Sequence, residues 1–252
     1  MFLLMILLSA GIAAGQEHKI PVQNTKEGKL ILKNFTNDLP VEGYSGNEII
    51  ITSTSDDFTP PERAKGLRPI YPGGTDNSGL GLNVEKEGSV VTVICMLPIT
   101  KRADYKIRVP DNLSIEIESG CERSSNISIV GMKNEIDIQA CHGIDLKNVT
   151  GPLVLSTISG DIDIVFSNMT PDKPMSINAI GGEIDITLPA KTAANLDLKT
   201  IGGSFYSDFE FTQTKDNLKR IGGSELGYAL NGGGPKFSIA TVGGNVYIRK
   251  GN

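Results

Sequence analysis

The residues best suited to chemistry in this chain are acidic side chains that recur beside paired small residues. Asp161 and Asp163 form one such set, and Glu183 and Asp185 form the next. If the two segments stack as neighbouring strands in register, corresponding carboxylates lie about 5 Å apart. Stacked like charges repel unless a cation bridges them, so these residues are candidates for a calcium site or for the acid/base pair of a carbohydrate-active lyase or hydrolase. The competing interpretation, which we favour, is a solvated face that keeps a sheet soluble.

The rest of the chain offers few groups for catalysis. It has two histidines, His18 and His142, and it lacks the Gly-x-Ser-x-Gly and P-loop patterns. Cys121, Cys141 and His142 do not resemble a zinc site, because there is no Cys-x-x-Cys and no second histidine nearby. We expect no enzyme, no catalytic residue, no metal and no cofactor.

The overall charge also narrows the choice of partner. The chain has 24 Lys and Arg residues against 29 Asp and Glu residues, a formal net charge of -5. This balance provides no basic surface for phosphate backbones, so we expect no nucleic-acid partner.

Four glycine pairs and one Ser-Gly pair mark an internal repeat that must position the acidic residues. The second residues of these pairs are spaced by 22, 21, 20 and 21 residues, a period that is typical of solenoids. We expect each of them to be a hinge, where a positive φ or a close approach of two backbones would require glycine. The five hinge candidates are Gly160, Gly182, Gly203, Gly223 and Gly244.

Apolar residues recur at fixed offsets from these glycines. Counting positions -7, -5, -2, +2 and +4 over the five copies gives 21 apolar residues out of 25, against 39% in the whole chain. The two-residue spacing on each side predicts two short strands per copy, each with one buried face. On this pattern both Ile180 and Ile184 should face the core. We therefore predict an all-β, single-domain β-solenoid (β-helix) with coils of about 20–22 residues. A β-sandwich with coincidental glycines is the alternative.

The start of the chain has the features of a secretory signal peptide. Residues 1–15 carry no charged side chain, contain an apolar run from Phe2 to Leu8 and end in small residues. We expect residues 16–252 to form the solenoid domain, with less regular opening coils over 16–110 and regular glycine-hinged coils over 111–252. No later apolar run reaches the length of a membrane span. The mature chain should be exported, to the periplasm or the extracellular face of the cell envelope.

Three cysteines are consistent with export. Cys121 and Cys141 lie 20 residues apart, close to one coil, so they could face each other on neighbouring coils and form a disulfide. Cys95 follows the apolar run from Val90 and is expected to be a buried, unpaired thiol.

A segment without periodicity interrupts the opening coils. The stretch from Pro60 to Gly81 is rich in proline and glycine and should be a long loop. It concentrates basic and aromatic groups within an acidic chain, which suits contact with an anionic glycan or a protein partner. A solvated loop is the alternative. The binding candidates are Arg63, Lys65, Arg68 and Tyr71.

The repeated motifs carry a resemblance to a known family. They read Ile-Ser-Gly-Asp-Ile-Asp-Ile (158–164), Ile-Gly-Gly-Glu-Ile-Asp-Ile (180–186) and Val-Gly-Gly-Asn-Val-Tyr-Ile (242–248), after a strand over 105–110. With these motifs the chain resembles the putative adhesin family of bacterial envelope β-solenoids, and its loop over 62–82 is similar to members from Bacteroidota. The resemblance implies a β-solenoid fold, export to the envelope and an adhesin-like role, and it carries no catalytic residues.

Our working hypothesis is a non-enzymatic envelope module that binds a glycan or a protein. A carbohydrate-active β-helix lyase or hydrolase is one alternative, and calcium binding with turnover of acidic polysaccharide would favour it. A periplasmic partner of an envelope-stress system is the other.

Overall fold

The computed structural model describes residues 16–53, 55, 61–67, 69–71, 74–122, 126–169, 173–214, 218–220 and 223–251. The expected signal peptide, residues 1–15, lies outside the described residues.

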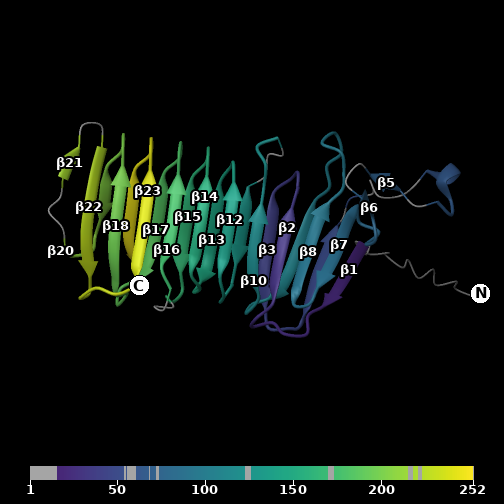
Figure 1. The fold of residues 1–252 in the computed structure, drawn as a ribbon, viewed down its shortest axis with the longest axis horizontal. Coiled ribbons are helices and arrows are strands. Elements are labelled where there is room, and N and C mark those ends of the chain that lie inside the picture. Colours follow the sequence, from purple (N-terminus) through teal and green to yellow (C-terminus); the bar gives the residue numbers. More distant parts are fainter. Residues whose placement is uncertain are drawn as a thin grey trace, which may run out of the picture.

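Two long sheets lie face to face along the molecule and form an elongated solenoid (Figure 1). Sheet A has ten strands, in the spatial order β1 (Gln16–Pro21), β4 (Glu48–Ser53), β9 (Tyr105–Pro110), β3 (Leu39–Tyr44), β11 (Ile127–Val130), β13 (Ile144–Val149), β15 (Ile162–Phe166), β17 (Ile184–Pro189), β24 (Val246–Gly251) and β19 (Phe205–Ser207). The all-β solenoid predicted from the repeat is confirmed.

Sheet B has twelve strands and packs against sheet A. Its order is β20 (Thr212–Gln213), β22 (Gly223–Leu230), β18 (Ala194–Thr200), β23 (Lys236–Thr241), β16 (Met175–Ala179), β14 (Leu153–Thr157), β12 (Ile136–Ala140), β10 (Ser114–Glu118), β2 (Lys29–Lys33), β8 (Val90–Cys95) and β7 (Leu82–Glu87), with β21 (Leu218–Arg220) paired to β22. A regular coil is one strand of sheet B followed along the chain by one strand of sheet A, as in β14–β15 or β16–β17.

The buried faces follow the two-residue alternation of the sequence. In the coil β14–β15, Leu153 and Leu155 point inward from sheet B, and Ile162 and Ile164 point inward from sheet A. Neighbouring coils repeat these contacts in register, so that Ile162 pairs with Ile184. The result is one continuous hydrophobic core between the sheets.

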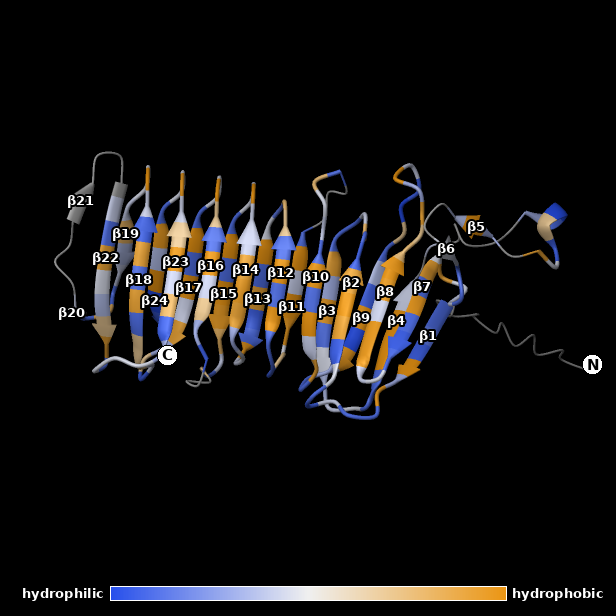
Figure 2. Cartoon of the chain, in the orientation of Figure 1, coloured by the Kyte–Doolittle hydropathy of each residue, from blue (hydrophilic) through white to orange (hydrophobic). Residues whose placement is uncertain are grey.

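The prediction for position -2 is wrong. Ile158, Ile180, Ile201 and Val242 are exposed by 49%, 54%, 63% and 43%, at the corners between sheet B and sheet A. Strict alternation from -7 and -5 leads inward to -3, so the residue at -2 starts the corner and points outward. Figure 2 shows these corners as a row of hydrophobic tips along one edge of the solenoid.

Buried threonines occupy position -3 and were not recognised in the sequence. The Thr157 hydroxyl donates to the carbonyl oxygen of His142 at 2.7 Å, and the Thr241 hydroxyl donates to that of Gly182 at 3.2 Å. Each bond joins a corner to the neighbouring coil and satisfies a carbonyl that the turn removes from the sheet ladder.

The corner glycines are required by close packing and not by a positive φ. Gly160, Gly182, Gly203 and Gly244 are absent from the residues with positive φ in the described part of the chain. A Cβ atom on Gly182 would lie 1.9 Å from the carbonyl oxygen of Gly160, and one on Gly203 would lie 1.9 Å from that of Gly244. Stacked coils therefore touch through their backbones at this corner. Gly223 begins the long strand β22 and pairs with Arg220 of the antiparallel strand β21.

The coils do not stack in chain order. The last coil, β23–β24, lies between β16–β17 and β18–β19, so that Val246 pairs with Ile184 on one side and with Phe205 on the other. Figure 1 shows this C-terminal coil, in yellow, among strands that precede it in the sequence. The reason is that β22 runs antiparallel along the far edge of β18, which leaves β23 only the near edge. The fourth repeat copy, which matched the apolar pattern poorly, supplies β21 and β22 in place of a coil.

The opening strands are less regular than the coils that follow them. Here β1, β4 and β7 pair antiparallel with their neighbours, whereas β2 and β3 pair parallel with the coil β10–β11.

Candidate functional site

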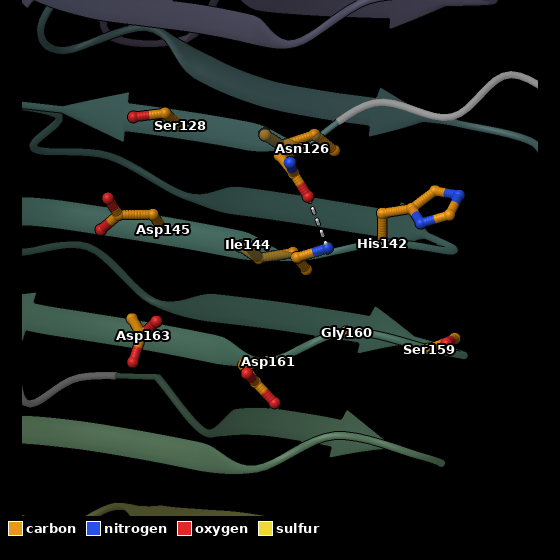
Figure 3. Close-up of a pocket in the computed structure, with 11 residues that line it drawn as sticks. Asn126, Ser128, His142, Ile144, Asp145, Ser159, Gly160, Asp161 and Asp163 are labelled. Atoms are coloured by element: carbon orange, nitrogen blue, oxygen red, sulfur yellow. Dashed lines mark hydrogen bonds between the residues drawn. The ribbon is translucent and has the colours of Figure 1, made fainter.

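A shallow depression of about 480 Å³ lies on the outer face of sheet A, where β11, β13 and β15 meet the corners (Figure 3). It is lined by Asn126, Ile127, Ser128, His142, Gly143, Ile144, Asp145, Ser159, Gly160, Asp161 and Asp163. Small residues leave the floor low, and polar side chains stand around it. Such a surface offers many hydrogen-bonding groups to a ligand.

The carboxylates of the depression form part of a column across sheet A. Asp145 on β13 pairs with Asp163 on β15, which pairs with Asp185 on β17. Figure 3 shows Asp145 and Asp163 on adjacent strands, while Asp161 points toward the following coil. The predicted stacking of Asp163 over Asp185 is confirmed by this register.

Asp161 holds neighbouring coils together. Its Oδ1 accepts a hydrogen bond from the backbone N–H of Glu183 at 2.8 Å. Asn126 accepts in the same way from Gly143 at 3.2 Å, and Asn245 from Ser204 at 3.0 Å. The residues share a structural task, because each satisfies a backbone donor at the start of the next coil.

The other two candidates on the next coil also have protein partners. Glu183 Oε1 accepts from the side-chain amide of Asn245 at 3.0 Å and from the hydroxyl of Tyr247 at 3.3 Å. Asp185 accepts from Arg249 through both oxygens, at 2.7 to 2.9 Å. Bidentate pairs of this kind fix side-chain geometry as well as charge.

Asp163 differs from its neighbours. Within the described part of the chain no hydrogen bond or ion pair is found for it, whereas Asp145 accepts from Lys147 at 2.6 Å. Partial burial raises the pKa of Asp163, and repulsion from Asp185 and then Asp145 raises it further. Asp163 is therefore the carboxylate of the column that is most available to a ligand.

The four calcium candidates do not form a metal centre in the residues described. No group of three or more His, Cys, Asp or Glu residues there is arranged to hold a metal ion. Asp163 and Asp185 lie side by side on neighbouring strands, but Arg249 occupies the position beside Asp185 that a metal ion would take.

An aromatic pair continues the column. Tyr247 pairs with Asp185, and Tyr206 pairs with Tyr247. The two rings stack with centroids 5.3 Å apart and planes at 15°, and Arg249 lies over the Tyr247 ring at 5.5 Å. The apolar repeat placed both tyrosines at the same offset from a glycine, but their contact depends on the coil order, which the repeat does not reveal.

The structure joins Cys121 and Cys141 in a disulfide with a Cα–Cα distance of 5.1 Å. The bond connects the corner of the coil β10–β11 to that of β12–β13, where the later coils have exposed aliphatic residues at -2. Cys95 is buried and takes no part in this disulfide.

The structure describes three of the four binding candidates in the loop over 62–82. Arg63 lies in the short 3-10 helix η2 (Glu62–Ala64), and both it and Lys65 are exposed. Tyr71, on the two-residue strand β5 (Ile70–Tyr71) that pairs with β6 (Gly74–Thr75), packs against the core, and burial raises its pKa. Arg68 lies outside the described residues.

The fold and the polar column define this protein as a parallel β-solenoid with a continuous outer face. The chain belongs to the Toastrack DUF4097 family, whose sequence pattern matches residues 109–249. The resemblance drawn from the repeated motifs is thereby confirmed.

Three solved structures are similar to the chain over most of both lengths. A "putative cell adhesion protein" from Clostridium sporogenes is 13% identical, with a TM-score of 0.44, covering 94% of this chain and 100% of its own. A "putative adhesin" from Bacteroides fragilis is 11% identical with a TM-score of 0.39, covering 93% and 95%. A "putative adhesin" from Parabacteroides merdae is 13% identical with a TM-score of 0.34, covering 96% and 98%.

No curated protein matches the chain. In the part of the chain that the structure describes, no helix has the length and apolar character needed to cross a membrane.

Proposed function

We propose that this protein is an exported, non-enzymatic module of the cell envelope that acts as an adhesin-like binding or scaffold surface for an envelope glycan or protein. The observation that carries the proposal is the outer face of sheet A, where polar side chains stand in columns at strand spacing over successive coils. Solenoids use such extended, regular surfaces to contact long partners.

The use of the carboxylates supports binding over catalysis. Asp161 accepts a hydrogen bond from the backbone N–H of Glu183, and Asp185 forms an ion pair with Arg249. Both carboxylates keep neighbouring coils in register. The surface is therefore rigid before a ligand binds, and it loses little conformational entropy on binding.

One observation favours the alternative of a lyase or hydrolase. Asp163 and Asp185 are adjacent, and their surroundings differ, since partial burial and then repulsion raise the pKa of Asp163, whereas Asp185 forms an ion pair with Arg249. Pairs of carboxylates in unlike environments are used as acid and base.

Two assays on the full chain separate these functions. Sedimentation with envelope fractions from the producing bacterium should show saturable binding, and incubation with acidic polysaccharides, with and without calcium, should show no new reducing or unsaturated ends. Turnover that disappears in Asp163→Asn would establish the enzyme instead. Failure to bind any envelope fraction would overturn the binding module.

A further inference from the structure

We propose that the outer face of sheet A from β13 to β19 binds a neutral oligosaccharide that lies across the strands. This inference rests on the proposed binding function and names the ligand class and the residues. Tyr206 and Tyr247 form the stacking end of the site, and Asp163 and the depression beside it form the hydrogen-bonding end.

The residues of the site lie in one line. Asp145, Asp163, Asp185, Tyr247 and Tyr206 occupy the same register position on five adjacent strands. With strands about 4.8 Å apart, the line is about 19 Å long, which accommodates a short oligosaccharide. A linear glycan can follow such a line because its sugar units repeat at a similar interval.

The Tyr206 ring has the chemistry of a sugar platform, because Tyr206 and Arg249 already cover the Tyr247 ring. Pyranose rings have an apolar C–H face, which packs on aromatic rings, and a rim of hydroxyls. Tyr206 is 53% exposed, and its strand β19 is the edge of sheet A among the described strands. The ring face that does not contact Tyr247 is therefore accessible to a ligand.

The platform is already held in place. The Tyr247 hydroxyl donates to Glu183 at 3.3 Å, and Arg249 lies over the ring while it holds Asp185. A side chain that is ordered before binding loses little conformational entropy on binding, so its contact area contributes more to affinity.

The other end of the line supplies hydrogen bonds to hydroxyls. Asp163, for which the described residues provide no hydrogen-bonding partner, can accept from sugar hydroxyls. Ser128, Asn126 and His142 line the same depression and add donors. Sugars with adjacent hydroxyls are bound by this mixture of carboxylate, amide and hydroxyl groups.

The column also specifies the charge of the ligand. Three stacked carboxylates repel a uronic acid, and the two cations beside them, Lys147 and Arg249, are already paired with Asp145 and Asp185. The site therefore selects neutral sugars over anionic ones, in contrast to the anionic glycan expected at the loop of Arg63 and Lys65.

Calorimetric titration of the full chain tests this site with cellohexaose, chitohexaose and hexagalacturonate as probes. We expect at least one neutral hexasaccharide to bind and hexagalacturonate not to bind. Tyr206→Ala should weaken binding about tenfold, and Tyr206→Phe should keep it because the ring face is retained. Tyr44→Ala is the matched control, since Tyr44 stacks with Arg108 on the same face of sheet A but on the distant strand β3.

Three results would overturn the proposal. These are the absence of binding by both neutral probes, equal losses in Tyr206→Ala and Tyr44→Ala, or hexagalacturonate binding as tight as that of the neutral probes. Envelope binding by wild type that is unchanged in Tyr206→Ala would also reject this site while leaving the envelope-binding function intact. Thermal unfolding of each variant checks that the loss is not one of folding, and Tyr206→Phe gives the answer if the alanine variant is unstable.

Discussion

Asp185 on β17 and Arg249 on β24 form a bidentate ion pair across neighbouring strands, although they are 64 residues apart in the sequence. The Arg249 Nη2 atom lies 2.7 Å from Asp185 Oδ2. This pair joins the last coil of the chain to a coil that precedes it by three repeats, and Arg249 also lies over the Tyr247 ring. The residues that join these two coils therefore also belong to the candidate glycan site.

The inserted coil predicts which cysteine pairs can be cross-linked. Ala240 on β23 lies between Asn178 on β16 and Lys199 on β18. Asn178→Cys with Ala240→Cys should form a disulfide under mild oxidation, because neighbouring strands bring Cα atoms within the roughly 4.4–6.8 Å that the bond requires. Asn178→Cys with Lys199→Cys should not, since two strand spacings separate them. Cross-linking of the second pair, detected by peptide mapping, would mean that the coils stack in chain order.

Core and corner isoleucines should differ in their contribution to stability. Ile184 is fully buried between the sheets, so Ile184→Ala should lower the free energy of unfolding by about 2–5 kcal/mol. Ile180 is 54% exposed at a corner, so Ile180→Ala should cost less than about 1 kcal/mol. Denaturant titration of the two variants measures both values. Similar losses would contradict the outward position of the corner residue.

A methyl group added at a corner glycine should destabilise the fold through steric overlap between coils and not through backbone strain from a positive φ. Gly182→Ala places a Cβ atom 1.9 Å from the carbonyl oxygen of Gly160, and the two coils must move apart. We expect a loss of about 3 kcal/mol, as for other overpacked sites. Gly120→Ala is the control, because nothing lies within 4 Å of its Cβ position. Equal stability of the two variants in thermal unfolding would mean that the corner backbones are farther apart.

Asp163 should destabilise the folded protein at neutral pH. Its folded-state pKa is raised from the ordinary 3.8, so the folded chain binds this proton more tightly than the unfolded chain. The unfavourable contribution is absent below the unfolded pKa and develops as the pH rises through the folded pKa. Asp163→Asn should therefore raise the denaturation midpoint at pH 7 and leave it unchanged near the acid end. Asp185→Asn should give no such gain, because it leaves Arg249 without its partner.

Thiol counting tests the disulfide. In denatured but unreduced protein, one thiol, that of Cys95, should react, and under native conditions almost none should, because Cys95 is buried. The bridge closes a loop of 20 residues, so Cys141→Ser should lower the stability by about 3 kcal/mol. Three reactive thiols in the denatured protein from an oxidising compartment would show that Cys121 and Cys141 do not pair.

Local pattern was sufficient to predict much of the fold. The alternation around Ile162 and Ile164 predicts a strand with one buried face, and the period of the glycines predicts coils of one length. Both depend on neighbours in the sequence, which is why β14–β17 agree with the prediction residue by residue. The prediction for Ile180 failed because inward and outward residues alternate along a strand. The inward residues lie seven, five and three positions before the glycine, so Ile180, two positions before it, points outward.

The local pattern therefore specifies the coil: its length, its inward residues, its small corner residue and a carboxylate on its outer face. Which coils are neighbours depends on contacts between distant parts of the chain. Every regular coil presents the same kind of apolar edge, so the repeat does not distinguish Val246 from Phe205 as the partner of Ile184. That choice follows from the antiparallel strand β22, which closes the far edge of β18 and directs the chain back into the stack. The contact of Tyr206 with Tyr247, and the pairing of Arg249 with Asp185, exist because of it.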